Sequence, residues 1–200
     1  GLGFIGSNFI LFSLKNNPKI KITNVDACLT GSNLKNLSEL KNSKRYKFVK
    51  SNIKNQKTIN ELVSKNDLVI NFAAESHVDR SISNPKPFLD SNIIGTYSIL
   101  EAIRKYDKKL IQISTDEVYG SLEKNSADEN FILNPSSPYS SSKASADLLV
   151  KSYNITYGCD IKISRCTNNY GPRQFPEKLI PKVIINALSD KSIPVYGNGK

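Results

Sequence analysis

Methionine and tryptophan are absent from this sequence, and histidine occurs only once, as His77. One histidine beside scattered carboxylates offers no cluster of metal-ligand spacing, so no metal site is predicted. The three cysteines, Cys28, Cys159 and Cys166, are an odd number without Cys-x-x-Cys spacing. They argue against a disulfide framework and a zinc site and favour a reducing, cytoplasmic compartment. No apolar run reaches about 18 residues, so no membrane span is expected.

Both ends of the sequence resemble cut ends. Gly1 opens directly into a glycine-rich stretch, and the sequence stops in YGNGK, a turn signal that follows an apolar run. We therefore expect a fragment of a longer protein.

Positive charge exceeds negative charge, with 28 Lys and Arg against 18 Asp and Glu and a formal net charge of +10. The lysines are scattered and form no stripe interleaved with aromatic residues, as a nucleic-acid surface would require. A solvated lysine-rich surface is the better interpretation, and its positive potential would attract an anionic small substrate.

Apolar runs alternate with amphipathic stretches along the chain. Strands are predicted at 21–26, 46–52, 67–74, 109–115 and 159–166. Helices are predicted at 5–15, 56–65, 92–106 and 141–158. This alternation predicts an α/β fold with a doubly wound parallel sheet of the Rossmann type. The polar loop 120–138 is the longest interruption, and loops of that length beside strand ends are often functional.

The glycine-rich start of the chain predicts a nucleotide site. Gly1, Gly3 and Gly6 stand directly before a helical pattern, as in loops whose backbone N–H groups bind a pyrophosphate at a helix N-terminus. Asp26 ends the next predicted strand, where a carboxylate can accept hydrogen bonds from an adenosine ribose. Together they predict a dinucleotide cofactor, NAD in preference to NADP.

Tyr139 and Lys143 lie four residues apart at the start of a predicted helix, so both side chains share one face. An ammonium group near a phenol is expected to lower its pKa from about 10. Such a tyrosine can take a proton from a sugar hydroxyl while hydride leaves the same carbon. The Tyr-x-x-x-Lys pattern alone is weak, because an exposed tyrosine near an exposed lysine is common.

Adjacent carboxylates, Asp116 and Glu117, follow the predicted strand 109–115. A solvated pair at a turn is the simplest interpretation. The same pair could instead supply one neutral acid and one ionised base, because like-charge repulsion favours that division.

The chain resembles the extended short-chain dehydrogenase/reductase family, also called the NAD-dependent epimerase/dehydratase family, and within it the dTDP-glucose 4,6-dehydratases. The resemblance rests on GLGFIGSN at 1–8, NFAAESHVDRSI at 71–82, STDEVYG at 114–120, PYSSSKASADLLVKSY at 138–153 and NNYGPRQFPEKLIP at 168–181. It implies a lyase of nucleotide-sugar metabolism that is a homodimer at full length. It also implies an NAD-binding domain at 1–167 and the start of a sugar-nucleotide region at 168–200.

The resemblance implies roles for the residues named above. Tyr139 would remove the C4 hydroxyl proton, Lys143 would tune Tyr139 and hold the nicotinamide ribose, and Thr115 would bind the C4 oxygen. Glu117 would take the C5 proton, and protonated Asp116 would donate to the departing C6 hydroxyl. Two adjacent acids are then needed because two adjacent carbons react.

The resemblance also implies two binding sets. NAD would contact Gly1, Gly3, Phe4, Ile5, Gly6, Asp26, Asn52, Ile53, Ala73, Ala74, Ser91, Tyr139, Lys143 and Asn169. The nucleotide sugar would contact Ser76, Thr115, Asn168, Lys178, Leu179, Pro194, Val195 and Tyr196. His77 would be hydrogen-bonded near the cofactor without a catalytic role.

Departures from the family pattern weaken parts of this assignment. Asn52 stands where the family commonly has an aspartate near the adenine, and the stretch after Asp26 is atypical. The interval 116–139 is shorter than is typical, and the basic residues expected on the diphosphate would lie beyond Lys200.

Other functions remain open from the sequence alone. The first alternative is a UDP- or GDP-sugar 4,6-dehydratase or a sugar-nucleotide epimerase of the same fold, although the Asp116–Glu117 pair disfavours an epimerase. The second is a non-catalytic NAD-binding module, which the presence of both Tyr139 and Lys143 disfavours. A nucleic-acid binder would show strongly salt-dependent retention on DNA.

The first strand of the predicted sheet, which should precede Gly1, is missing from the sequence. That strand is central in a Rossmann sheet. Residues 1–200 expressed alone are therefore expected to fold poorly, and cooperative melting of that polypeptide in calorimetry would contradict this expectation.

Overall fold

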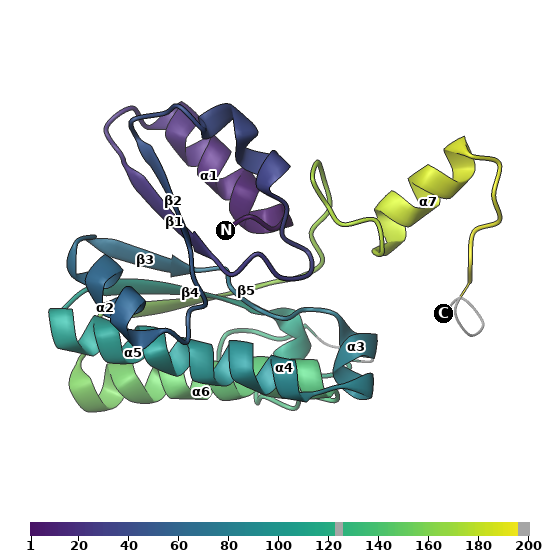
Figure 1. Cartoon of the computed structure of the whole chain (residues 1–200). Coiled ribbons are helices and arrows are strands. Elements are labelled where there is room, and N and C mark those ends of the chain that lie inside the picture. Colours follow the sequence, from purple (N-terminus) through teal and green to yellow (C-terminus); the bar gives the residue numbers. More distant parts are fainter. Residues whose placement is uncertain (123–125, 196–200) are drawn as a thin grey trace. The chain divides into compact units, whose positions relative to one another are not determined.

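In the computed structural model, which describes residues 1–122 and 126–195, helices alternate with strands (Figure 1). The strands are β1 (Ile22–Asp26), β2 (Tyr46–Lys50), β3 (Leu68–Asn71), β4 (Lys109–Thr115) and β5 (Ile161–Cys166). The α-helices are α1 (Phe4–Asn16), α2 (Gln56–Ser64), α3 (Val78–Ser83), α4 (Lys86–Phe88), α5 (Gly95–Tyr106), α6 (Pro138–Tyr157) and α7 (Leu179–Leu188). Shorter helical segments are η1 (Leu34–Leu40), η2 (Leu89–Ile94) and η3 (Asp116–Tyr119).

Strands β3, β4 and β5 form a parallel sheet in which Leu68 pairs with Lys109 and Leu110 pairs with Ile161. Strands β1 and β2 pair separately. The predicted α/β class with parallel strands is confirmed. Among the residues described, no strand bridges β1 and β3, which is the position of the first strand in a doubly wound sheet.

The main core lies where α2, α5 and α6 pack together and against β4. It contains Ile59 and Val63 of α2, four residues of α5, Leu110 of β4, and Val150 and Tyr153 of α6, with Cys159 beyond that helix. Figure 1 shows α5 and α6 running along one face of the three-stranded sheet. Because both helices are anchored by this apolar cluster, their N-terminal ends hold fixed positions at the carboxyl edge of β4.

Local sequence explains where the key elements begin and end. Ser137 caps α6 in a reciprocal capping box with Ser140, Pro138 occupies the first turn, and Gly158 ends the helix with φ 69°. Strand β3 stops at Asn71, earlier than the predicted 67–74, because the Asn71 side chain accepts a hydrogen bond from the Ala73 backbone N–H at 3.1 Å. That bond turns the chain away from the sheet.

The chain divides into two compact units. One contains residues 1–22, 28–46 and those from Asn169 onward, and the other contains residues 23–27 and 47–168. The predicted domains, 1–167 and 168–200, are drawn on substrate binding and remain a prediction. None of the helices in the described ranges has the length and hydropathy needed to cross a membrane.

The sequence did not reveal η1, α3, η3 or α7. Each is short or carries an apolar pattern too brief to separate from a loop. The predicted helix 92–106 is also part of a longer helical run that starts at Lys86 and includes the π-helical segment η2.

Candidate active site

The end of β4 and the first turns of α6 bring the predicted catalytic residues together. Thr115 is the last residue of β4 and caps η3, accepting a hydrogen bond from the Glu117 backbone N–H at 3.2 Å. Its hydroxyl donates to Asp116 Oδ1 at 3.2 Å and is hydrogen-bonded to the Tyr139 phenol. One threonine therefore links the phenol to the carboxylate pair.

Tyr139 is buried, with 8% of its surface exposed, and its ring meets Phe88 edge-to-face at 6.3 Å. Burial raises the pKa of Tyr139 to about 12, and the nearby Glu117 and Asp116 carboxylates add to the rise. The expected lowering of this pKa is therefore wrong for the protein without its cofactor. The cost of placing a phenolate in a poorly solvated, acidic environment exceeds any benefit from Lys143.

Lys143 is also buried, with 4% of its surface exposed, and its ammonium donates to the Ile113 carbonyl of β4 at 2.6 Å. Burial lowers the pKa of Lys143 to about 8, while Asp147 and Cys166 oppose that lowering. The ammonium is thus satisfied by the backbone of the strand that carries Thr115. The predicted one-face arrangement of Tyr139 and Lys143 on α6 holds, but the lysine's partner is a carbonyl.

Asn92 was missed by the sequence analysis, although it connects two predicted segments of the site. Its amide accepts from the Glu75 backbone N–H at 3.0 Å and donates to the Glu75 carbonyl at 3.0 Å. It also donates to Ser142 Oγ at 2.8 Å, and Ser142 in turn bonds the Tyr139 carbonyl at 2.7 Å. The chain after β3 is therefore fixed to the turn of α6 that bears Tyr139. A lone asparagine within an amphipathic helix gives no signal of such a role.

Ala73, Ala74 and Ser91 adjoin this asparagine in the chain or through Glu75, and all three are half-buried. Ser76 and Asn168 are exposed. These positions lie in the same unit as Tyr139 and Lys143. The structure therefore gathers the predicted catalytic residues and leaves the predicted contacts of Ser76 and Asn168 open to solvent.

The glycine loop fits an anionic ligand. Gly3 caps α1 without any side-chain hydrogen bond, so no side chain occupies the helix N-terminus. A Cβ at Gly6 would lie 2.8 Å from the Gly1 Cα, so this turn requires glycine. Such a cradle of backbone N–H groups at the start of a helix suits the pyrophosphate of a dinucleotide. Phe4 and Ile5 begin the same helix.

The predicted adenosine contacts are placed at the ends of β1 and β2. Asp26 ends β1, and its carbonyl accepts from the Ser51 backbone N–H at 3.1 Å. Asn52 is exposed, and its side-chain carbonyl already accepts from the Lys54 backbone N–H at 2.9 Å. Ile53 packs beside Gly95, where a Cβ would come within 2.3 Å of the Ile53 Cδ1. Asn52 therefore uses locally the acceptor that was expected to face the adenine.

The remaining predicted contacts lie in the other unit. Asn169 is exposed, Lys178 caps α7, and Leu179, Pro194 and Val195 are exposed. Tyr196 lies outside the described residues. Arg173, which the sequence analysis did not single out, bonds Asn8 Oδ1 at 3.1 Å and the Asn36 carbonyl at 3.3 Å. The segment after Asn169 is thereby fastened to α1 and η1.

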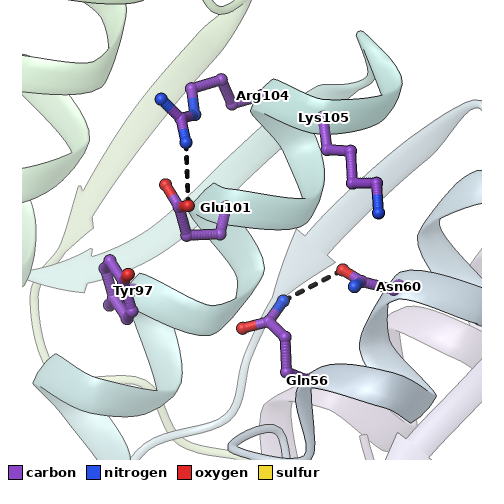
Figure 2. A pocket seen from close by; sticks show the side chains of 6 residues that line it. All are labelled: Gln56, Asn60, Tyr97, Glu101, Arg104 and Lys105. Atoms are coloured by element: carbon purple, nitrogen blue, oxygen red, sulfur yellow. Dashed lines mark hydrogen bonds and ion pairs between the residues drawn. The ribbon is translucent and has the colours of Figure 1, made fainter.

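A separate cavity of about 510 Å³ opens between α2 and α5, lined by Gln56, Asn60, Tyr97, Glu101, Arg104 and Lys105. Figure 2 shows Glu101 paired with Arg104 and Gln56 bonded to Asn60. Glu101 also accepts from the Tyr153 hydroxyl at 2.5 Å. None of these residues belongs to the predicted catalytic or binding sets, so the cavity is distinct from the predicted site.

The chain is similar to known nucleotide-sugar enzymes over its whole length. A family model described as GDP-mannose 4,6 dehydratase matches residues 1–200. A protein of Actinoplanes sp. named dTDP-glucose 4,6-dehydratase is 43% identical over 206 residues, covering 100% of this chain and 64% of that protein. The match thus spans less than two thirds of that relative.

Two solved structures are similar as well. The dTDP-glucose 4,6-dehydratase from Bacillus anthracis, in complex with NAD, has a TM-score of 0.92 and 46% identity, over 99% of this chain and 62% of that one. The UDP-glucuronic acid 4-epimerase from Bacillus cereus, in complex with UDP-glucuronic acid and NAD, has a TM-score of 0.93 and 30% identity, over 99% of this chain and 64% of that one. The fold is shared by both proteins, while identity is higher with the dehydratase.

The depressed pKa of Lys143 predicts a stability that rises with pH. Below pH 8 the folded and unfolded chains both hold this proton, and the folded state bears the full cost of burying it. From pH 8 towards 10.5 only the unfolded chain keeps the proton, so the folded state gains in relative stability. Relative to Lys143→Met, the full-length wild-type protein should gain about 2 kcal/mol in free energy of unfolding between pH 8 and pH 10.

Urea unfolding at several pH values measures this difference. Lys151→Met removes an exposed lysine from the same helix and serves as the control. Parallel pH profiles for the wild type and Lys143→Met would contradict the prediction.

Proposed function

This chain belongs to the GDP-mannose 4,6-dehydratase family, and on that premise we propose that the full-length protein is a dTDP-glucose 4,6-dehydratase, an NAD-dependent hydro-lyase. The observation that carries the proposal is the cluster of Tyr139, Thr115, Asp116 and Glu117, joined through the Thr115 hydroxyl. A phenol beside an acid–base pair suits oxidation of one carbon followed by elimination across its neighbours. The dTDP-glucose enzymes among its relatives support the choice of nucleotide.

The first step would oxidise C4 of the sugar. Thr115 would donate to the C4 oxygen, and Tyr139 would accept the C4 hydroxyl proton as hydride leaves the carbon. Bound NAD would supply the hydride acceptor and a positive nicotinamide charge that opposes the carboxylates raising the Tyr139 pKa. Lys143, held by the Ile113 carbonyl, would keep its ammonium beside the reaction below pH 8.

The second step would eliminate water from C5 and C6. A ketone at C4 acidifies the C5 proton, because the carbanion is delocalised as an enolate. Glu117 would take that proton, and Asp116 would give its own to the C6 hydroxyl as it leaves as water. Hydride return to C6 and protonation of C5 would complete the 4-keto-6-deoxy sugar, dTDP-4-dehydro-6-deoxyglucose, an intermediate suited to deoxysugar biosynthesis.

The cofactor set is proposed as predicted from the sequence. The glycine loop, with Gly1, Gly3, Phe4, Ile5 and Gly6, would bind the pyrophosphate, and the tight approach of Gly6 to Gly1 supports this. Asp26 would bind the ribose, with Asn52 and Ile53 near the adenine. The other proposed contacts are Ala73, Ala74, Ser91, Asn169, Tyr139 and Lys143.

The nucleotide sugar would contact Ser76, Thr115, Asn168, Lys178, Leu179, Pro194, Val195 and Tyr196. A lysine beside a diphosphate supplies charge with little geometric selectivity. Selection among dTDP-, UDP- and GDP-sugars is therefore left to other contacts, and a sugar-nucleotide epimerase of this fold remains the alternative.

A cytoplasmic homodimer at full length is proposed as well. No disulfide joins Cys28, Cys159 and Cys166, all within the described residues, which suits a reducing compartment. Exposed apolar side chains on α5 and α6, among them Tyr97, Leu148 and Ile155, support pairing of two copies. Sedimentation equilibrium of the full-length protein measures its association.

A direct assay tests the proposed reaction. The full-length gene product incubated with dTDP-glucose should convert it to a product lighter by one water, with no net accumulation of NADH. UDP-glucose and GDP-mannose are compared at equal concentration and should react more slowly. Unchanged dTDP-glucose with retained NAD binding would sink the assignment and leave only a cofactor-binding protein or another nucleotide sugar.

Glu117→Gln separates oxidation from elimination. Glutamine cannot take the C5 proton, so dehydration should slow by about 100-fold or more. Oxidation at C4 should continue, so the near-ultraviolet absorbance of NADH should accumulate after mixing with substrate. Glu61→Gln, which changes an exposed carboxylate on α2, should behave as the wild type. Normal product formation by Glu117→Gln would remove Glu117 from the mechanism.

A further inference from the structure

A buried ion pair lies one helical turn beyond Lys143. Asp147 on α6 has 0% of its surface exposed, and its Oδ2 accepts from Arg165 Nε of β5 at 2.8 Å. Its other oxygen, Oδ1, has no hydrogen-bond partner among the described residues. Such pairs seldom add net stability, because desolvation offsets the attraction. Their retention in the interior calls for another reason.

Arg165 carries this pair to the carboxylate turn. Its NH1 donates to the Tyr119 hydroxyl at 2.9 Å, and its guanidinium lies 5.1 Å from the centre of the Tyr119 ring. The same NH1 reaches the Glu129 carbonyl at 3.4 Å. Burial opposes the charge, yet the hydrogen bonds to Asp147 and Tyr119 raise the pKa of Arg165 above its ordinary value. The guanidinium thus stays charged and fixed.

Tyr119 is the last residue of η3, the short segment that begins with Asp116 and Glu117. Few backbone bonds hold this segment: the Gly120 N–H donates to the Glu117 carbonyl at 3.2 Å, and the Asn134 N–H donates to the Val118 carbonyl at 3.0 Å. Thr115 fixes the front of the turn, and Tyr119 is the only side chain of η3 that Arg165 bonds among the described contacts. The rear of the turn therefore depends on the Tyr119–Arg165 contact.

We propose that Asp147, Arg165 and Tyr119 form a positioning chain that holds the Asp116–Glu117 turn in place for elimination. Asp147 anchors the guanidinium to the helix that bears Tyr139 and Lys143, and Arg165 anchors the turn to β5. The chain touches no reacting atom; it sets where the two carboxylates stand. Its catalytic consequence rests on the proposed dehydratase function, whereas its effect on the turn does not.

Tyr119→Phe tests the chain with the smallest change, because it removes one hydroxyl and keeps the ring that packs at 6.0 Å from Phe131. Tyr153→Phe is the matched control: Tyr153 has the same 8% exposure and also bonds a charged group, Glu101, away from the site. In the full-length protein, amide hydrogen exchange across 116–120 should quicken in Tyr119→Phe and stay unchanged in Tyr153→Phe. With dTDP-glucose, Tyr119→Phe should eliminate water about tenfold more slowly and accumulate NADH.

Arg165→Lys provides a second variant, since lysine keeps the charge for Asp147 but cannot bond both Asp147 and Tyr119 in a fork. It should reproduce the faster exchange and the NADH accumulation. Because both substitutions break the same contact, Tyr119→Phe/Arg165→Lys should be no slower than the slower single variant.

The outcomes separate the two proposals. Faster exchange at 116–120 with no reaction of dTDP-glucose by the wild type would support the positioning chain and reject the proposed function. Dehydration by the wild type with unchanged exchange and no NADH accumulation in Tyr119→Phe would reject the positioning chain and keep the function. A lower melting temperature alone, equal in Tyr119→Phe and Tyr153→Phe, would reduce the chain to a structural contact and overturn the proposal.

Discussion

The Lys143 ammonium sits between α6 and β4 with almost no solvent contact, and a charge in that position must be compensated. The Ile113 carbonyl at 2.6 Å supplies the direct bond, and Asp147 on the next turn supplies the opposite charge. Both partners fix the register between helix and strand. Because Thr115 ends that strand and Tyr139 opens that helix, the lysine contact also sets the distance between the hydroxyls that meet there.

The site is therefore built from polar groups that are each satisfied by a neighbour of known position. Asn92 joins the chain after β3 to the Tyr139 turn, and Thr115 joins the Tyr139 phenol to Asp116. Buried networks of this kind restrict side-chain rotation, which proximity catalysis requires. The apolar cluster of α2, α5, α6 and β4 lies behind them and carries no chemistry of its own.

Burial has an opposite effect on the two titrating groups that face each other across the first turn of α6. It raises the Tyr139 pKa and lowers the Lys143 pKa, since both charged forms lose solvation. The free site thus favours a neutral phenol. A positive charge brought by a ligand would shift the phenol towards ionisation, so proton transfer is coupled to occupancy of the site.

The sequence by itself determined the α/β class, the parallel strands, the family and the grouping of Tyr139 and Lys143 on one helix face. These follow from periodicity and from residues close together in the chain, where spacing fixes geometry. Only the tertiary structure decided that Lys143 bonds the Ile113 carbonyl, that the Tyr139 pKa rises, and that Asn52 spends its acceptor on a turn. Asn92, Asp147 and Arg165 also emerged only there. Their partners are far away in sequence, and burial, which sets the strength and sign of each charge interaction, is a property of the packed fold.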